Sequence, residues 1–253
     1  MLKLVFYFFV VATINTVGFS QTQDFNATNS ASYGKGVTVG FSTLFANLGK
    51  PFTNSRCIAD SPNTKALCGT EVLIKGTLEE ERATLVFVSP FQLNIVIPQK
   101  FYGDTIQIKV KSQIGEQSSL FIVGNNPGVF TANGSGTGQL AAVYTYDGVS
   151  YYPTYYFDTN LGVFIGLTVD SVYNGKQNYL ILYGTGLKTN TKVAFVNGNH
   201  THISNVEYCG GTFIDGLDQV NVKVPRLPQG NWLVFVISDG VISNAGNILL
   251  SGN

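Results

Sequence analysis

The sequence is poor in charge and in histidine. Only 12% of its 253 residues are charged, the 15 Lys and Arg balance the 15 Asp and Glu, and two histidines are present. No field of either sign would attract phosphate groups, so the composition argues against nucleic acid and against anionic lipid as partners. Nucleic-acid binding is therefore excluded from the expected functions.

Long apolar runs are also few. The run at residues 4–12 follows Lys3 and precedes the small residues Gly18 and Ser20. It is shorter than the roughly 20 apolar residues that a membrane span needs. The pattern predicts a secretory signal peptide over residues 1–20. No apolar tail is present near residue 253, so we expect no membrane insertion after cleavage and a secreted, extracellular or cell-surface location.

Cysteine is scarce, with three residues in all. Cys57 and Cys68 flank a polar stretch that contains a Ser-Pro-Asn turn signal. In an oxidising compartment this spacing predicts a disulfide that closes a short loop, with two buried free thiols as the alternative. Cys209 is left over, either as a small core residue or as a link between molecules.

What the sequence has in quantity is turn residues and β-prone residues, with 28 Gly, 8 Pro and 13% aromatics. Gln-Leu-Asn-Ile-Val-Ile-Pro at 92–98 returns as Gln-Val-Asn-Val-Lys-Val-Pro at 219–225, with aliphatic residues in the same alternating phase. This pattern is typical of a half-buried strand that occurs in two like modules. We predict an all-β protein made of two tandem immunoglobulin-like β-sandwich modules.

The expected boundaries follow from composition. Residues 21–30 are short of apolar side chains, which predicts a flexible segment before a first module at 31–125. An Asn-Asn-Pro-Gly turn signal then opens a linker hairpin and second module at 126–253. The charged run at 78–82 is expected to form a loop.

An aromatic cluster surrounds the Asp147-Gly148 turn signal, which predicts a β-hairpin. Strict alternation can bury only about half of these side chains. The rest are expected on an exposed face or against a partner, while packing onto the neighbouring module is the alternative. The candidate binding surface consists of Tyr144, Tyr146, Tyr151, Tyr152, Tyr155, Tyr156 and Phe157.

Residues with catalytic chemistry are sparse. A hydrolase triad would have to use His200 or His202, yet no Gly-x-Ser-x-Gly motif occurs anywhere. These histidines with Glu207 could line a metal site, but a polar loop is the simpler interpretation. Asp215 and Asp218 are expected to cap turns. We expect no enzyme activity, no catalytic or metal-binding residues and no cofactor.

Several strings, taken in order, resemble one family. They lie at residues 29–33, 88–98, 127–131, 136–139, 182–187 and 216–222. The chain is similar to the uncharacterised C-terminal domain family named for Solibacter, itself similar to IPT/TIG immunoglobulin-like modules. The resemblance implies export and a pair of Ig-like sandwiches, and it implies no activity.

The expected function is therefore binding at a surface. We expect an exported, non-catalytic protein that acts by protein–protein binding, adhesion or self-assembly. Its partners would be like subunits or other cell-surface proteins, reached through strand edges, the tyrosine hairpin or strand addition by residues 21–30. The alternative is a carbohydrate-binding module, with exposed tyrosines stacking on sugar rings. Tyrosines lying flat and coplanar on an open face would favour that alternative.

Overall fold

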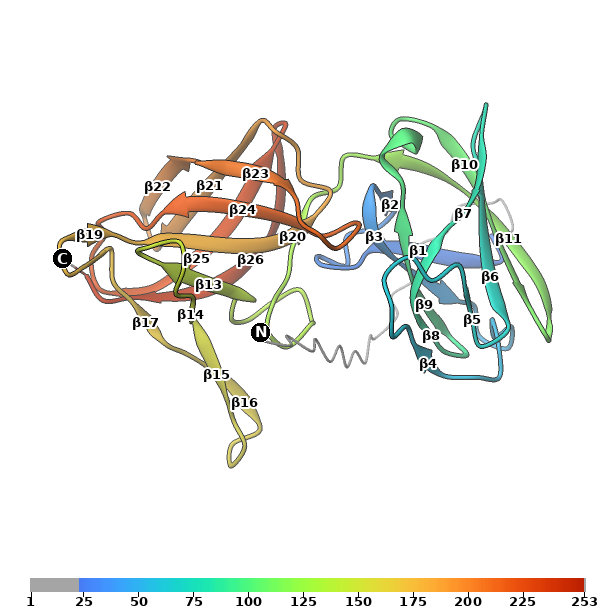
Figure 1. Cartoon of the computed structure of the whole chain (residues 1–253), viewed down its shortest axis with the longest axis horizontal. Helices are drawn as coiled ribbons and strands as arrows, with labels where there is room; N and C mark the ends of the chain where they lie inside the picture. The colour runs from blue at the N-terminus through green and yellow to red at the C-terminus, as the bar shows by residue number, and fades with distance from the viewer. Residues whose placement is uncertain (1–22, 253) are drawn as a thin grey trace.

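A computed structural model describes residues 23–252 of the chain (Figure 1). Strands form almost all of its regular structure, and a single 3-10 turn spans Gln99–Phe101. The strands build two β-sandwiches that lie end to end (Figure 1). No helix in this part of the chain has the length and apolar character needed to cross a membrane. The predicted signal peptide at 1–20 lies outside the described residues.

The first sandwich consists of two sheets. One has the strand order β1-β3-β9-β8-β4, and the other has the order β2-β11-β10-β6-β5 with β7 paired to β6. The strands are β1 (Phe25–Asn29), β2 (Val37–Thr38), β3 (Gly40–Ala46), β4 (Cys57–Ile58), β5 (Ala66–Leu67), β6 (Thr70–Lys75), β7 (Glu80–Arg82), β8 (Thr84–Val88), β9 (Gln92–Ile97), β10 (Thr105–Ser112) and β11 (Gly115–Gly124).

The second sandwich repeats this plan. One sheet has the order β14-β13-β20-β24-β23 with β12 on β20, and the other has the order β17-β26-β25-β21-β22. The strands are β12 (Gly128–Val129), β13 (Ala142–Thr145), β14 (Tyr152–Pro153), β17 (Thr168–Val169), β20 (Tyr179–Thr185), β21 (Thr191–Asn197), β22 (His200–Asn205), β23 (Tyr208–Gly211), β24 (Asp218–Lys223), β25 (Gly230–Ser238) and β26 (Val241–Leu250).

The two sandwiches have equivalent topologies. In each, a short early strand pairs in parallel with the last strand, β2 with β11 and β17 with β26. The strands that carry the repeated sequence, β9 and β24, occupy the same place, beside β3 in one module and β20 in the other. The fold is thus all-β, with two tandem Ig-like sandwiches, as the repeat predicted.

Alternating burial explains why these segments form strands. In β10 the side chains of Ile106, Ile108 and Val110 are buried, while those between them face outward. Each sandwich has its own core, one drawn from residues 25–123 and the other from residues 129–250. In the second core the indole of Trp232 is buried and its Nε1 donates to the carbonyl of Pro228 at 3.1 Å.

The prediction of a flexible segment at 21–30 is wrong for residues 25–29. These form strand β1, which pairs antiparallel with β3. The Phe25 ring is fully buried, 5.3 Å from the Phe52 ring centroid and 5.8 Å from that of Phe121. This polar segment forms a strand because its backbone pairs with β3 and because the Phe25 side chain enters the core. The segment is therefore not available for strand addition to a partner.

The charged run at 78–82 also differs from its prediction. Glu80–Arg82 form β7, an edge strand paired with β6. Lys100 binds both Glu79 and Glu81, at 2.6 and 2.8 Å. A short, charged edge of this kind discourages pairing with a strand of another molecule.

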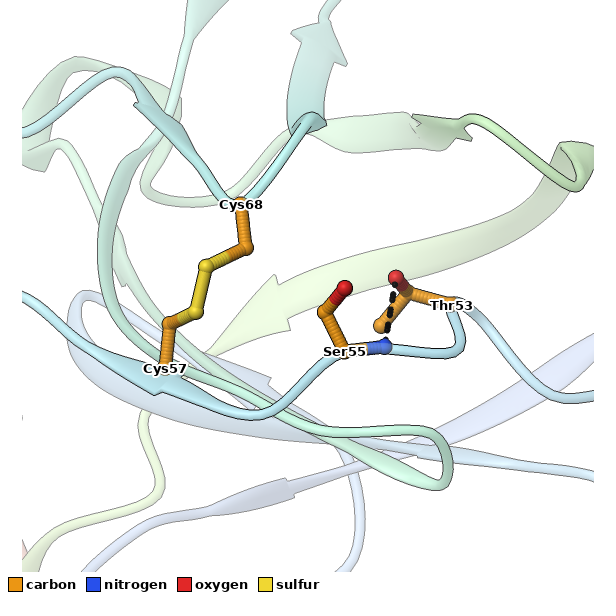
Figure 2. Close-up of a disulfide and its surroundings, with 4 residues drawn as sticks. All are labelled: Thr53, Ser55, Cys57 and Cys68. Carbon is orange, nitrogen blue, oxygen red and sulfur yellow. Dashed lines mark hydrogen bonds between the residues drawn. A yellow bond between two sulfur atoms is a disulfide. The ribbon is translucent and has the colours of Figure 1, made fainter.

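The predicted disulfide between Cys57 and Cys68 is present (Figure 2). Cys57 begins β4 in one sheet, and Cys68 directly follows β5 in the other, with 6.3 Å between the two Cα atoms. The bond therefore ties together the edges of the two sheets of the first sandwich. Beside it, the amide of Ser55 donates to Thr53 Oγ1 (Figure 2). Cys209 is a free thiol, partly buried against the second core, 3.0 Å from the carbonyl of Lys188.

Candidate binding surface

The hairpin predicted around Asp147-Gly148 is formed by β13 and β14, with Tyr144 opposite Tyr152. Asp147 builds the turn, since its carboxylate accepts the amides of Val149 and Ser150 at 2.9 and 2.8 Å. These backbone hydrogen bonds lower the pKa of Asp147 to about 2. Because β13 also pairs with β20, the hairpin is the edge of the second sandwich.

Three tyrosine rings of this hairpin and a fourth from a neighbouring element form a ladder. The ring centroids of Tyr144 and Tyr152 lie 5.3 Å apart, those of Tyr152 and Tyr146 5.9 Å apart, and those of Tyr146 and Tyr173 4.9 Å apart. The hydroxyls of Tyr146 and Tyr152 lie 3.4 Å apart, and this hydrogen bond, with some burial, raises the pKa of Tyr146 to about 12. Lys176 Nζ lies 5.9 Å from the centroid of the Tyr146 ring.

Tyr173 was not among the predicted residues. It lies on β18 (Val172–Tyr173), which pairs with β19 (Lys176–Gln177) to form a two-stranded sheet. An Asn-Gly turn at 174–175 joins the two strands, with both residues at positive φ. This turn signal could have identified the hairpin, but nothing in the sequence places it beside Tyr146.

The geometry of the ladder helps to distinguish a protein partner from a carbohydrate ligand. The rings stack on one another, with interplanar angles of 28° for Tyr144 with Tyr152 and 18° for Tyr146 with Tyr152. With centroids 5.3 and 5.9 Å apart, neighbouring rings are offset and each covers only part of the next ring's face. A sugar ring stacks on a free aromatic face, and the ladder leaves less of each face open than an isolated tyrosine would.

The other predicted aromatic residues lie on a second hairpin. β15 (Tyr155–Asp158) and β16 (Val163–Gly166) pair only with each other among the described residues, with Phe157 opposite Phe164. We call this β15–β16 hairpin, residues 155–166, the arm. It projects from the second sandwich, drawn in yellow in Figure 1.

The arm exposes large apolar side chains. Tyr156 is 45% exposed, Phe157 49% and Val163 48%, and Leu161 at its tip is 67% exposed. On one face the rings of Phe157 and Phe164 contact each other, with centroids 4.9 Å apart. Apolar residues thus lie on both faces of a sheet that has no core of its own, and such a patch is typical of a contact surface.

The seven predicted aromatic residues differ in burial and in the element to which they belong. Tyr144, Tyr146 and Tyr155 are partly buried, whereas Tyr151, Tyr152, Tyr156 and Phe157 are exposed. Tyr144, Tyr146 and Tyr152 meet in the ladder, while Tyr155, Tyr156 and Phe157 belong to the arm.

The polar side chains considered for metal binding or catalysis either make structural contacts or have no neighbouring metal ligands among the described residues. His200 and His202 lie exposed on β22, and residues 23–252 contain no group of three His, Cys, Asp or Glu placed to hold a metal. Glu207 binds Lys223 at 2.9 Å. Asp218 accepts the amide of Leu187 at 2.8 Å, as expected for a turn cap, although burial raises its pKa.

The two modules contact each other through residues outside the predicted aromatic surface. A small cluster of apolar side chains joins them, and the Phe41 and Phe130 ring centroids lie 6.2 Å apart. Tyr33 donates to the carbonyl of Gly134 at 2.8 Å, and burial raises the pKa of Tyr33 to about 12. The cluster consists of Ala31, Phe41, Phe130, Ala141, Tyr183, Ile214 and Leu217. We call it the junction.

Most of the strings that carry the family resemblance converge at the junction. Ala31 and Tyr33 come from the first of them, Phe130 from the third, and Tyr183 and Leu217 from the last two. The glycine loop at 133–138 lies here as well, since the carbonyl of Gly134 accepts from Tyr33 of the first module. These strings therefore have a structural role in holding the modules together.

A cleft of about 370 Å³ lies beside the junction, lined by both modules. Lys65 and Glu81 line it from the first module, and Lys188 and Asp218 from the second. Lys188 Nζ lies 3.9 Å from the centroid of the Tyr102 ring of the first module. This cation–π contact links the modules, and burial lowers the pKa of Lys188.

The chain was compared with known proteins. No protein-family model matches it, and no curated protein matches it. Among solved structures, pullulanase type I from Bacillus subtilis complexed with maltose is 10% identical over 91% of this chain and 25% of that chain, with a TM-score of 0.22. The chain thus spans about a quarter of that protein's length.

Two of the other matches are immunoglobulin-domain structures. Titin Ig tandem domains A164–A165 are 8% identical over 86% of this chain and 91% of that chain, with a TM-score of 0.22. The N-terminal four Ig domains of Dscam1 are 10% identical over 92% of this chain and 73% of that chain, with a TM-score of 0.22. At this level of similarity, the Ig-like fold rests on the strand topology described above.

Proposed function

We propose that this chain is an exported, non-catalytic binding protein that contacts other proteins through the arm. Export is supported by the signal pattern at 1–20 and by the Cys57–Cys68 disulfide, which is compatible with an oxidising location. The observation that carries the proposal is the exposure of Tyr156, Phe157 and Val163 on a two-stranded sheet that pairs with nothing else in the described chain.

The arm needs a partner to be stable. An isolated two-stranded hairpin is marginal in water, and a third strand or a covering surface is needed to stabilise it. The arm carries four large exposed apolar side chains and unpaired backbone groups along its outer edges. A protein partner supplies both apolar contact and hydrogen bonds, whereas a glycan supplies few apolar contacts. The stacked tyrosine ladder likewise supports a protein partner over a sugar.

The test is site-specific photo-cross-linking in cells that produce the full chain. Benzoylphenylalanine replaces Phe157 on the arm or, as a control, Leu48, which is 85% exposed on the first module. We expect light-dependent adducts with one discrete protein, identified by mass spectrometry, from position 157 and none from position 48. Absence of adducts from position 157, or equal adducts from both positions, would overturn the proposal.

A further inference from the structure

We infer that the partner of the arm is the arm of a second copy of this chain, paired antiparallel along β15. This inference rests on the proposed function and names its partner. The two arms would form one four-stranded sheet across a twofold axis, which gives each hairpin the additional strands that it lacks alone.

The outer edge of β15 is the free edge. β16 contacts β26 at the base of the arm, whereas β15 pairs only with β16. The amide of Leu167 donates to the carbonyl of Thr154 at 2.8 Å, which fixes the register of the hydrogen-bonded pairs. In an antiparallel pair every second residue turns its amide and carbonyl away from the partner strand. On β15 these are Tyr155 and Phe157.

The twofold axis then determines the register. An axis perpendicular to the sheet keeps each side chain on its own face, so residues that face each other must be an even number apart in sequence. Centring the axis on Tyr156 places Tyr155 opposite Phe157 of the second copy, and both residues turn backbone groups toward that edge. The two Tyr156 side chains meet at the centre. Aromatic residues thus face aromatic residues, which is a favourable cross-strand combination.

The scarcity of charged residues in the arm favours pairing with a second arm over pairing with a charged partner. Asp158 is the only charged residue in the arm, and its carboxylate accepts the amides of Asn160 and Leu161 in its own turn, at 2.8 and 3.1 Å. In the register above it faces Thr154 of the second copy, so no like charges oppose each other. By contrast, edge strand β7 of the first module carries Glu80, Glu81 and Arg82, the charged pattern that prevents strand addition.

The arm is small, so the dimer should be reversible. A stable interface buries about 800 Å² on each partner, and a strand of four residues with its apolar neighbours offers less contact than such an interface usually has. We therefore expect dissociation within a range that sedimentation at several concentrations can follow.

The experiment is a charge exchange at the centre of the interface, measured by analytical ultracentrifugation of the mature 21–253 protein. Tyr156→Glu and Tyr156→Lys each place like charges opposite each other in the dimer, and each should raise the dimer Kd by at least about tenfold. An equimolar mixture of the two variants should dimerise again, because Glu then faces Lys. Phe213→Glu introduces the same charge at a side chain that is 96% exposed outside the arm, and it should dimerise as the unaltered protein does. Circular dichroism shows whether the variants remain folded.

A monomer at every concentration would overturn the inference, as would dimers of Tyr156→Glu as tight as those of the unaltered protein. A mixture of the two variants that stays monomeric would also overturn it. The two proposals can be told apart: adducts from position 157 to a different protein, with no self-association, would leave the binding role intact and remove only the second copy as partner.

Discussion

Thr185 of the second module accepts a hydrogen bond from the backbone amide of Phe41 in the first, at 2.7 Å, across the junction. The same hydroxyl donates to the carbonyl of Gly216 at 3.0 Å. One buried side chain thus satisfies a backbone group on each module. The junction is therefore a specific contact, in which the relative orientation of the two sandwiches is set by hydrogen bonds as well as by apolar packing.

Thr185→Val should weaken this contact. It keeps the shape of the side chain but removes the hydrogen-bond partner of two partly buried backbone groups, the amide of Phe41 and the carbonyl of Gly216. Each loss costs at most about 1–3 kcal/mol, the penalty for a fully buried group. The single tryptophan, Trp232, is buried in the second core, so its fluorescence during urea denaturation reports unfolding of that module. We expect a lower midpoint for the variant.

The matched control is Thr70→Val. Thr70 is also fully buried, and its hydroxyl has no hydrogen-bond partner within residues 23–252. Replacing an unsatisfied hydroxyl with a methyl group should be neutral or stabilising. Because Thr70 lies in the first module, both variants are followed by circular dichroism, which reports both modules, as well as by Trp232 fluorescence. If both valine variants changed the free energy of unfolding equally, the hydrogen bonds of Thr185 would contribute nothing specific.

Gly40→Ala should disturb the junction sterically. Gly40 has a φ of +89°, and an added Cβ would contact Thr185 Oγ1 and lie 2.7 Å from the carbonyl oxygen of Gly216. Gly103→Ala is the control, because Gly103 has a φ of +85° and open space around its Cβ position. Both variants carry the strain of a left-handed residue, about 1–2 kcal/mol. Gly40→Ala should lower the free energy of unfolding by about 1–3 kcal/mol more than Gly103→Ala through overpacking, as measured by chemical denaturation. Equal losses in the two variants would show that the junction accommodates the added methyl group without strain.

Removal of the disulfide should destabilise the first sandwich. The bond joins residues 11 apart in sequence, and a loop of this size contributes about 3 kcal/mol through the entropy of the unfolded chain. Cys57→Ser/Cys68→Ser should lower the free energy of unfolding by about this amount and abolish its sensitivity to reductant. Cys209→Ser should keep that sensitivity, since Cys209 is a free thiol. Retained sensitivity in the double variant would contradict the assignment.

Asp147 should make the protein less stable in acid. Its pKa is about 2 in the folded protein, below its ordinary value of 3.8. Its contribution to stability is therefore fully present above about pH 4 and is lost as the pH falls toward about 2. Asp147→Asn removes this titration, so the Tm of the unaltered protein should fall more steeply between pH 4 and pH 2 than that of the variant. Parallel curves would show that the turn does not depend on the carboxylate.

Local patterns in the sequence determined a large part of this structure. Side-chain alternation has a period of two in any strand, so β9, β10 and β24 could be predicted without knowledge of their neighbours. The Asp147-Gly148 turn identified the β13–β14 hairpin, because both hairpin strands are close in sequence. The spacing of Cys57 and Cys68 identified the disulfide for the same reason.

Only the tertiary structure decided the rest. Polar strand β1 is stabilised by pairing with β3 and by the burial of Phe25, and neither can be read from its composition. Tyr173 joins the ladder and Thr185 reaches Phe41 through contacts between residues distant in sequence. Whether an aromatic residue is buried or exposed depends on which element covers it. The sequence therefore predicted that some of the seven aromatic candidates would be exposed, but only the fold separated the ladder from the arm.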